Sequence, residues 1–330
     1  MRAAISSGCT FWDGGEFYGT PSSNSLTLLN DFFTSHPSEA DKVIVNIKGA
    51  LGPGMVVNAS PEALRQSVER CVQMLDGKAK IDMFECARRD RNVPLESELA
   101  TLQGLVEEGL IGGIALSEVN AETIRKAARL AKILAVEVEI SLFETGPLGN
   151  GITDACREFN IPILAYCPIG RGMLSGQIKC FDDLPEKDFR RMLPRFQPAN
   201  FENNMKLVKQ LEVLAQKKGC TSAQLAIVWI VNLSRREDMP TIIPIPGATT
   251  AERVMENAKA GEVKLNEEEM AEIGEVLKTC EVAGERYHAA GMKSISHDRN
   301  SLESLGAHHF SPRIQICMWG RKPNTFILSI

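Results

Sequence analysis

The sequence predicts an α/β protein built around a parallel sheet, and three features of the chain lead to this prediction. Short apolar runs alternate with longer segments that have the periodicity of amphipathic helices. The short runs are apolar at consecutive positions, as in strands that helices cover on both faces. No G-x-G-x-x-G motif follows the first run. A doubly wound sheet with a dinucleotide site at its first turn is therefore weakly supported, and a closed βα barrel is favoured.

The candidate strands are bounded by turn residues and separated by helical patterns. They cover residues 9–13, 43–48, 81–86, 112–117, 136–141, 161–166 and 241–245. In the first clear helix, Ser60 is a capping residue, Pro61 suits the first helical position and Glu62 places an acid in the first turn. The predicted helices cover residues 60–75, 96–108, 121–131, 203–218, 222–233 and 267–277.

Composition excludes several classes of protein. The chain has 330 residues, a hydrophobic fraction of 44% and a net charge of −5, so it can bury a core and lacks the basic character of a nucleic-acid binder. It contains no apolar run long enough to span a membrane and no secretory signal. The cysteines number nine, an odd count, and none form a C-x-x-C motif. We therefore expect a cytoplasmic protein with reduced thiols. The sequence does not reveal the oligomeric state.

The chain changes character after Glu285. Residues 286–330 lose strand and helix periodicity, and they hold four of the five histidines, at positions 288, 297, 308 and 309. The spacing of these histidines matches no pattern of metal ligands. We therefore expect a barrel over residues 1–285, an irregular C-terminal tail over residues 286–330, and no metal site.

Polar residues follow the first two predicted strands. Asp13 and Tyr18 stand in FWDGGEFYG, and Lys48 ends VIVNIKG. The C-terminal ends of barrel strands are where active sites form. A lysine cation within about 4–6 Å would lower the pKa of a tyrosine, and an aspartate could hold that lysine in place. The alternatives are that the Asp and Tyr spacing arises by chance and that the lysine is simply solvated.

These segments, taken with others in order along the chain, resemble the aldo-keto reductase family. FWDGGEFYG is similar to the signature in which an Asp and a Tyr five residues apart open the active site, and VIVNIKG is similar to the segment of the catalytic lysine. The resemblance continues through RQSVERCVQMLDGKAKIDMF, GLIGGIALSEVNAETI, AYCPIGRGMLSGQ, TSAQLAIVWI and IPIPGATTAERVMEN. It covers about residues 3–280 and implies a (β/α)8 TIM barrel that reduces a small carbonyl compound with NADPH.

The resemblance also implies roles for individual residues. Tyr18 would be the proton donor, Lys48 would modulate its pKa, and Asp13 would be the partner of the lysine. Ser117 and Glu137 would bind the nicotinamide carboxamide, although most relatives carry glutamine at the second position. The remaining cofactor contacts would be Tyr166 on the nicotinamide ring, Leu174 and Ser175 near the pyrophosphate, and Arg253, Glu256 and Asn257 at the adenosine 2′-phosphate and adenine.

The assignment of the phosphate site has a physical basis of its own. In barrels, phosphate sites form at the loops after strands 7 and 8 and at a helix N-terminus. Residues Gly247 to Arg253 read as such a strand-to-helix junction, and backbone N–H groups with an arginine fork suit a phosphomonoester. Thr249, however, replaces the basic residue that is usual in NADPH enzymes of the family.

One departure concerns the histidine that the family carries after its fourth strand. Alignment of FECARRD places Ala87 there. FECAR, FWDGGEFYG and Glu118 after Ser117 are similar to the fungal pyridoxal reductase branch, which implies reduction of pyridoxal to pyridoxine. Arg88 could donate a hydrogen bond or meet a phenolate or phosphate, or form a surface salt bridge. The alternative functions are an aldo-keto reductase of a fungal specialised-metabolite pathway and a non-catalytic NADPH-binding subunit that senses redox state.

The start of the chain suggests an incomplete barrel. AAISSGCTFWD resembles the end of the family's first helix followed by its second strand. We therefore expect the first strand and part of the first helix to be absent. The sheet should then have seven parallel strands, with a gap or a distorted closure between residues 9–13 and 241–245.

Overall fold

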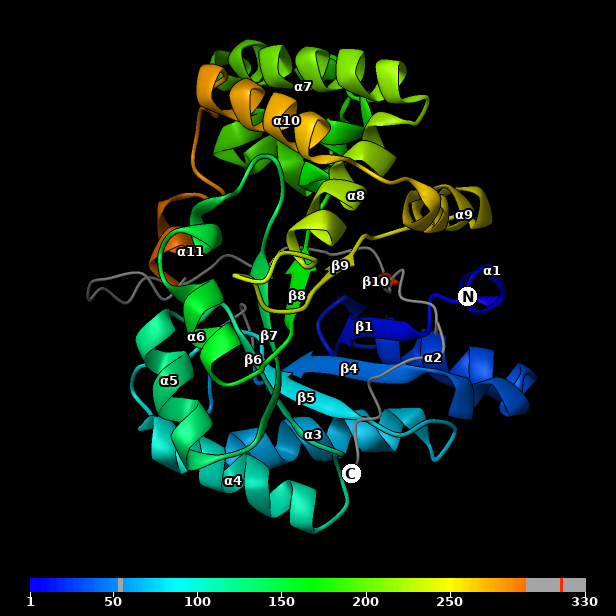
Figure 1. The fold of residues 1–330 in the computed structure, drawn as a ribbon. Helices are drawn as coiled ribbons and strands as arrows, with labels where there is room; N and C mark the ends of the chain where they lie inside the picture. The colour runs from blue at the N-terminus through cyan, green and yellow to red at the C-terminus, as the bar shows by residue number, and fades with distance from the viewer. Residues whose placement is uncertain (53–55, 295–314, 317–330) are drawn as a thin grey trace.

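Seven parallel strands form a single curved sheet with helices on its outer face (Figure 1). The computed structural model describes residues 1–52, 56–294 and 315–316. All seven predicted strands are present with slightly shifted ends, which confirms the parallel α/β architecture. In the order of their pairing they are β1 (Phe11–Gly15), β4 (Ile44–Gly49), β5 (Met83–Cys86), β6 (Ile114–Ser117), β7 (Ile133–Glu139), β8 (Ile163–Tyr166) and β9 (Ile242–Ile245).

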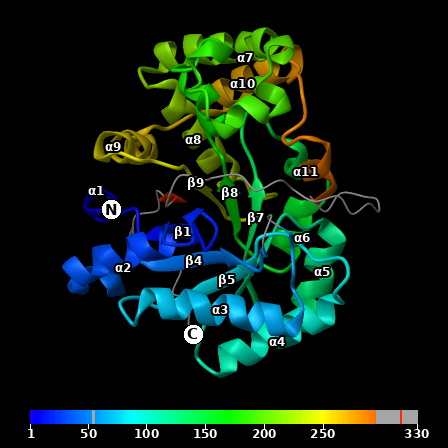
Figure 2. The same cartoon turned by 180° about the vertical axis from the view of Figure 1, so that it is seen from behind.

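The helices surround this sheet, with α3 and α4 on one side and α7 and α10 on the other (Figures 1 and 2). The predicted helix start at Ser60 is confirmed. The Ser60 side chain caps α3 by accepting a hydrogen bond from the N–H of Ala63 at 3.4 Å. In chain order the helices are α1 (Arg2–Ser6), α2 (Ser25–Ser35), α3 (Pro61–Leu75), α4 (Leu95–Glu107), α5 (Ala121–Leu130), α6 (Ile152–Glu158), α7 (Pro198–Lys218), α8 (Ser222–Leu233), α9 (Ala251–Lys259), α10 (Glu267–Thr279) and α11 (Ala289–Ser294).

The two faces of the sheet have separate apolar cores. Side chains on the outer face, such as Val45, Phe84 and Val136, join the large core beneath the helices. Alternate side chains point into the barrel and form a second, smaller cluster that consists of Phe11, Met83, Ala115, Ala135, Leu164, Tyr166 and Ile245. Because side chains alternate along a strand, the residue two positions after an interior one also points inward, closer to the C-terminal end. Asp13, Glu85, Ser117 and Glu137 therefore lie above this apolar cluster, towards the C-terminal ends of their strands.

The barrel is open between its first and last parallel strands. Among the described residues, β9 pairs with β8 alone, and Pro244 within it suits an edge strand because proline lacks an N–H. On the other edge, β10 (Gln315–Ile316) pairs antiparallel with β1, opposite Trp12 and Asp13. The predicted seven parallel strands and gap are confirmed, but two residues of the C-terminal region pair with one edge. Outside the gap, α1 lies beside α9 (Figures 1 and 2).

The region predicted as an irregular tail is ordered at its start. Arg286 is only 6% exposed, and α11 follows it, so the prediction of an irregular segment is wrong for residues 289–294. The reason is a set of ion pairs with the barrel that local sequence patterns do not encode. Residues 295–314 and 317–330, with His297, His308 and His309, lie outside the described residues.

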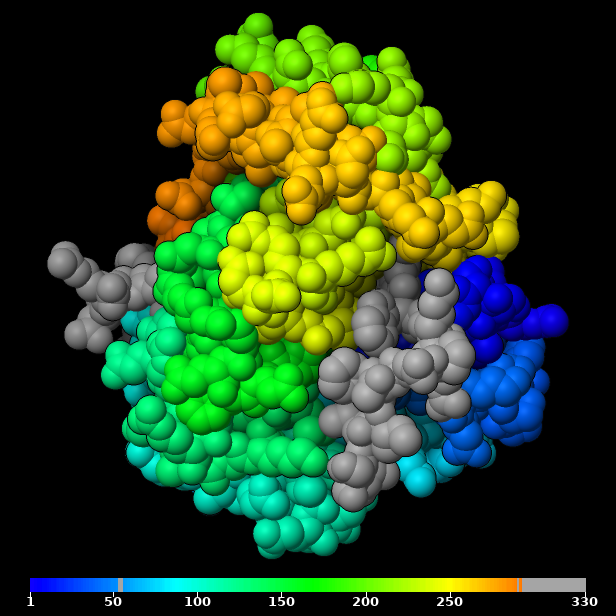
Figure 3. All heavy atoms as spheres, viewed as in Figure 1, coloured from blue at the N-terminus to red at the C-terminus, as the bar shows by residue number. Residues whose placement is uncertain are grey.

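The surface in Figure 3 is that of the N-terminal ends of the strands, where the connection from α8 to β9 (yellow) lies at the centre. In a βα barrel, the face opposite to such connections is where active sites form.

Within the described part of the chain, no helix is long and apolar enough to cross a membrane. The eight cysteines there are all unpaired.

Candidate active site

A buried lysine surrounded by carboxylates lies at the C-terminal ends of the first strands. Lys48 on β4 is 3% exposed, and its Nζ lies 2.5 Å from Asp13 Oδ2 on β1 and 2.7 Å from Glu137 Oε2 on β7. Glu85 on β5 adds a third carboxylate, at 3.4 Å. Asn46 Nδ2 donates to Asp13 Oδ1 at 2.9 Å and to Glu85 Oε1 at 3.2 Å. The three carboxylates are close enough to one another to hold a cation, and the Lys48 ammonium is the cation they hold.

The predicted proximity of Tyr18 to this lysine is present in the structure. Tyr18 follows β1 in the turn before β2 (Gly19–Thr20), and Lys48 Nζ lies 5.6 Å from the centre of its ring. The net effect on the phenol is the opposite of the one expected. Burial raises the pKa of Tyr18 well above its ordinary value, and the carboxylates of Asp13 and Glu137 add to the increase. The Lys48 cation lowers this pKa but does not outweigh the other contributions, so Tyr18 is a protonated phenol at neutral pH.

Two of the carboxyl groups around Lys48 titrate at unusually high pH. Burial raises the pKa of Glu85 to about 7, although the Lys48 cation opposes the shift. Burial and the charge of Asp13 raise the pKa of Glu137 well above its usual range. The Lys48 cation, 2.7 Å from Glu137 Oε2, opposes the shift at Glu137 as well.

The raised pKa of Glu85 predicts a pH dependence of stability. Its folded-state pKa of about 7 exceeds the ordinary value of 4.5, so the folded form binds more protons between these pH values and stability falls as pH rises through this range. Glu85→Gln should make the free energy of unfolding less dependent on pH between about 5 and 7, by up to about 1.4 kcal/mol per pH unit. Urea denaturation at several pH values measures this. The exposed control Glu186→Gln should retain the wild-type slope, and a Glu85→Gln protein that also retains it would contradict the prediction.

The predicted nicotinamide residues lie at the ends of three adjacent strands. Ser117 pairs in register with Glu137, and Tyr166 ends β8 opposite Glu139. Ser117 Oγ is buried and has no hydrogen-bond partner among the described residues. The next residue, Glu118, is buried in a left-handed conformation with φ 51°, which is costly for a non-glycine residue and is a kind of strain that recurs at functional sites.

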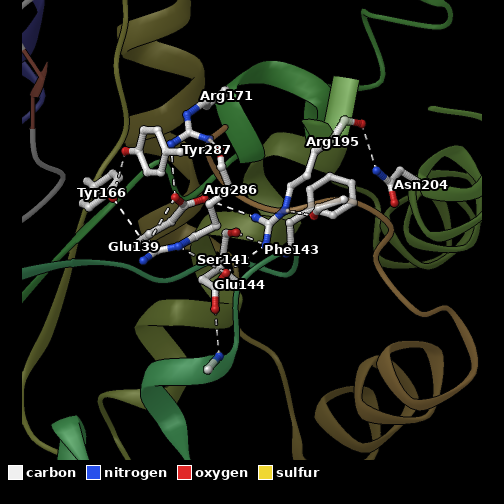
Figure 4. A network of polar contacts seen from close by, with 12 residues as sticks. Glu139, Ser141, Phe143, Glu144, Tyr166, Arg171, Arg195, Asn204, Arg286 and Tyr287 are labelled. Atoms are coloured by element: carbon white, nitrogen blue, oxygen red, sulfur yellow. Dashed lines mark hydrogen bonds and ion pairs between the residues drawn. The ribbon is translucent and has the colours of Figure 1, made fainter. Parts of the chain in front are cut away.

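The segment after α10 folds over this end of the barrel (Figure 4). Arg286 donates to both carboxylate oxygens of Glu118, at 3.1 and 2.9 Å, and lies 3.6 Å from Glu139 and from Glu144. Burial alone would raise the pKa of Glu118, but the charges of Arg286 and Arg88 lower it to about 2. Glu118 is therefore ionised throughout the neutral range, and its charge attaches the C-terminal segment to β6.

Tyr287 extends this network to the predicted nicotinamide residue. Its hydroxyl lies 3.1 Å from that of Tyr166 and 3.4 Å from Arg88 Nη2. The guanidinium of Arg171 lies 4.7 Å from the centre of the Tyr287 ring, while Arg171 Nη2 pairs with Glu139 at 3.2 Å. The hydroxyl of Tyr166 is thus hydrogen-bonded to the C-terminal segment through Tyr287.

The residues predicted to bind the phosphates lie at two neighbouring loops. Arg253 follows the N-cap Thr250 of α9, and its Nη2 donates to Gln177 Oε1 at 3.2 Å. Ser175, two residues before Gln177, ends the 3-10 helix Gly170–Ser175, in which Leu174 is buried. Of the other predicted residues, Asn257 is buried within α9, Glu256 is half-buried, and Gly247 and Thr249 are exposed in the loop before it.

Several residues of this site were missed by sequence reasoning. Glu85 and Glu139 had a signal, because each is a charged residue inside an otherwise apolar strand. Arg286 and Tyr287 had no such signal, because they follow the last predicted helix in a segment without helix or strand periodicity. The surface salt bridge considered for Arg88 is absent among the described residues, and its guanidinium contacts Tyr287 instead.

Comparison with known proteins decides the family. The family model described as "Aldo/keto reductase family" matches residues 1–278. The chain belongs to this family. It is 38% identical over 296 residues to "Probable pyridoxal reductase 2" of Schizosaccharomyces pombe, a match that covers 87% of each chain. It is 36% identical to "Putative pyridoxal reductase" of Saccharomyces cerevisiae, with 85% of each chain covered.

Solved structures agree with the fold of this aldo-keto reductase. The glycerol dehydrogenase of Gluconobacter oxydans superposes with a TM-score of 0.73 at 22% identity, covering 84% of each chain. The family match and the two fungal relatives confirm the resemblance to the aldo-keto reductases and to their pyridoxal reductase branch, and the chain is an oxidoreductase of that family.

Proposed function

We propose that this aldo-keto reductase reduces an aldehyde to the corresponding alcohol with NADPH, with Tyr18 as the proton donor and pyridoxal as the substrate. One observation carries the proposal. A protonated tyrosine and a buried lysine–carboxylate cluster meet at the C-terminal end of the barrel, with the Lys48 ammonium 5.6 Å from the Tyr18 ring. The names of the two fungal relatives support pyridoxal as the substrate. A cytoplasmic location and a role in specialised metabolism stay predictions.

The residues at the strand ends fit a nicotinamide cofactor. Ser117 Oγ is a buried hydroxyl without a partner among the described residues, and it lies in register with the Glu137 carboxyl, so the pair could bind a carboxamide. Tyr166 would contact the nicotinamide ring. The N-terminus of α9, with Arg253 and the loop of Ser175, would hold the phosphates. NADPH, when bound, would supply the hydride.

The protein's own contribution to the reaction is to hold and deliver a proton. The Tyr18 hydroxyl would donate a hydrogen bond to the carbonyl oxygen and give up its proton as that oxygen becomes an alkoxide, a stronger base than a phenolate. The phenolate left on Tyr18 would form beside the Lys48 cation, whose charge lowers the pKa of Tyr18. Asp13 would hold the ammonium in position through its 2.5 Å contact.

The proposal is tested by following NADPH oxidation with a panel of aldehydes that includes pyridoxal. Measurable turnover of pyridoxal to pyridoxine is expected. A protein that binds NADPH and reduces none of the aldehydes would contradict the proposal and favour a non-catalytic subunit that binds the cofactor and senses redox state.

Recognition of the 2′-phosphate of NADPH is expected to depend on Arg253. Loss of a charged hydrogen-bonding partner typically costs about 1.5–3 kcal/mol, so Arg253→Ala should weaken NADPH binding by about ten- to a hundredfold and leave NADH binding nearly unchanged. Titration of each cofactor by fluorescence measures both constants. Arg235→Ala, which removes an exposed arginine from the end of α8, is the control. Equal losses for NADPH and NADH in the Arg253 variant would show that this residue does not recognise the 2′-phosphate.

A further inference from the structure

Arg88 differs from the other arginines that gather at the C-terminal end of the barrel. Arg171 pairs with Glu139, Arg195 pairs with Glu144, and Arg286 pairs with Glu118. Arg88 makes no ion pair with a carboxylate of the described residues, although it is only partly exposed. The charge of Glu118 acts on Arg88 without an ion pair between them, and an anion of the substrate could supply a directly bonded partner.

The protein leaves most of the donors of Arg88 unused. Its Nη1 donates to the carbonyl of Ala87 at 2.6 Å, and its Nη2 donates to the Tyr287 hydroxyl at 3.4 Å. An arginine has five N–H donors, so three remain without a partner among the described residues. The guanidinium also lies 5.7 Å from the centre of the Tyr287 ring, which keeps it at the end of the barrel.

The position of Arg88 places its charge close to the reacting groups. Arg88 follows β5 by two residues, and β5 carries Glu85 of the Lys48 cluster. The electrostatic effect of Arg88 extends to the phenol of Tyr18 and to Glu118. Ala87, the residue before Arg88, is buried and offers only a methyl group. A ring whose carbonyl oxygen meets Tyr18 could therefore direct a neighbouring substituent towards Arg88.

We propose that Arg88 is a specificity-determining residue that binds an ionised oxygen next to the carbonyl group of an aromatic aldehyde. This inference rests on the proposed function and names the class of its substrate. Pyridoxal belongs to this class, because its ring hydroxyl is adjacent to the formyl group and is largely ionised at neutral pH. The ion pair is formed by binding and adds no step to the reaction.

The test compares two aldehydes that differ only in the ring oxygen: 3-hydroxypyridine-4-carbaldehyde and pyridine-4-carbaldehyde. The wild-type protein should have a kcat/KM about ten- to a hundredfold higher for the hydroxylated aldehyde. Arg88→Met should reduce this ratio to near one, and Arg88→Lys should give an intermediate ratio because a lysine keeps the charge without the fork. Arg91→Met, at an exposed arginine three residues along the chain, should keep the wild-type ratio.

A binding measurement separates recognition from turnover. With NADP⁺ present, calorimetry should show tighter binding of 3-hydroxy-4-(hydroxymethyl)pyridine than of 4-(hydroxymethyl)pyridine, and Arg88→Met should abolish that difference. If Arg88→Met lowers kcat/KM for both aldehydes equally, Arg88 acts on the carbonyl group or on the fold, and the inference is wrong.

The failure of the inference differs from the failure of the proposed function. A wild-type protein that reduces both aldehydes with equal kcat/KM, and whose ratio is the same in Arg88→Met, contradicts the role of Arg88 alone. A protein that reduces neither aldehyde with NADPH or NADH contradicts the reductase function, and the role of Arg88 with it.

Discussion

Replacing Tyr18 by phenylalanine is expected to lower the turnover number for aldehyde reduction by a factor of roughly 10²–10⁴. The change removes only the hydroxyl and keeps the ring beside Lys48, so the cluster of Lys48, Asp13 and Glu137 should stay intact. Without the phenol, the alkoxide formed from the carbonyl would have to take its proton from water. Steady-state kinetics with pyridoxal and NADPH measure the effect.

The control for this variant separates lost chemistry from lost structure. NADPH affinity and melting temperature should barely change in Tyr18→Phe. Tyr166→Phe removes a phenol at the same end of the barrel, but its hydroxyl bonds to Tyr287 rather than to a reacting atom, so a much smaller loss of turnover is expected. Full aldehyde reduction by Tyr18→Phe would show that another group donates the proton.

Replacing Arg286 by methionine is expected to lower the free energy of unfolding at neutral pH by about 3–5 kcal/mol, the usual cost of removing one partner from a buried ion pair. Glu118 would then be a buried carboxylate that has lost its ion-pair partner and keeps the N–H of Glu139 at 3.2 Å, a hydrogen bond with Tyr166 and the more distant charge of Arg88. Arg171 and Arg195 would still pair with Glu139 and Glu144, so the loss falls mainly on Glu118. Urea denaturation of the two proteins gives the difference.

The pH dependence of this difference tests the assignment to Glu118. The pKa of Glu118 falls from 4.5 to about 2 on folding, so its ion pair contributes stability above about pH 4.5 and loses it as pH drops towards 2. The gap between wild type and Arg286→Met should shrink over the same range. Lys278→Met, which removes an exposed ion pair with Glu275, should change stability by less than about 1 kcal/mol. A similarly small change in the free energy of unfolding of Arg286→Met would mean that the Arg286–Glu118 ion pair does not anchor the C-terminal segment.

The strands and the first catalytic candidates were predictable because they depend on short stretches of sequence. A buried parallel strand needs consecutive apolar residues, and the location of Asp13 and Lys48 at the active-site end of the barrel follows from their positions at strand ends. The capped start of α3 at Ser60 and of α9 at Thr250 depends on residues within one turn. Family resemblance added the roles of the individual residues, which composition and periodicity do not contain.

The sequence by itself determined the seven parallel strands and the places of Asp13 and Lys48 at the C-terminal ends of the first two. Only the tertiary structure decided the ionisation of Tyr18, because burial and the carboxylates around Lys48 act together to raise its pKa. It also decided the place of Arg286, which reaches Glu118 from 168 residues away. Local patterns record the burial and turns of neighbouring residues, whereas the charge that a buried group meets depends on which distant segments the fold brings to it.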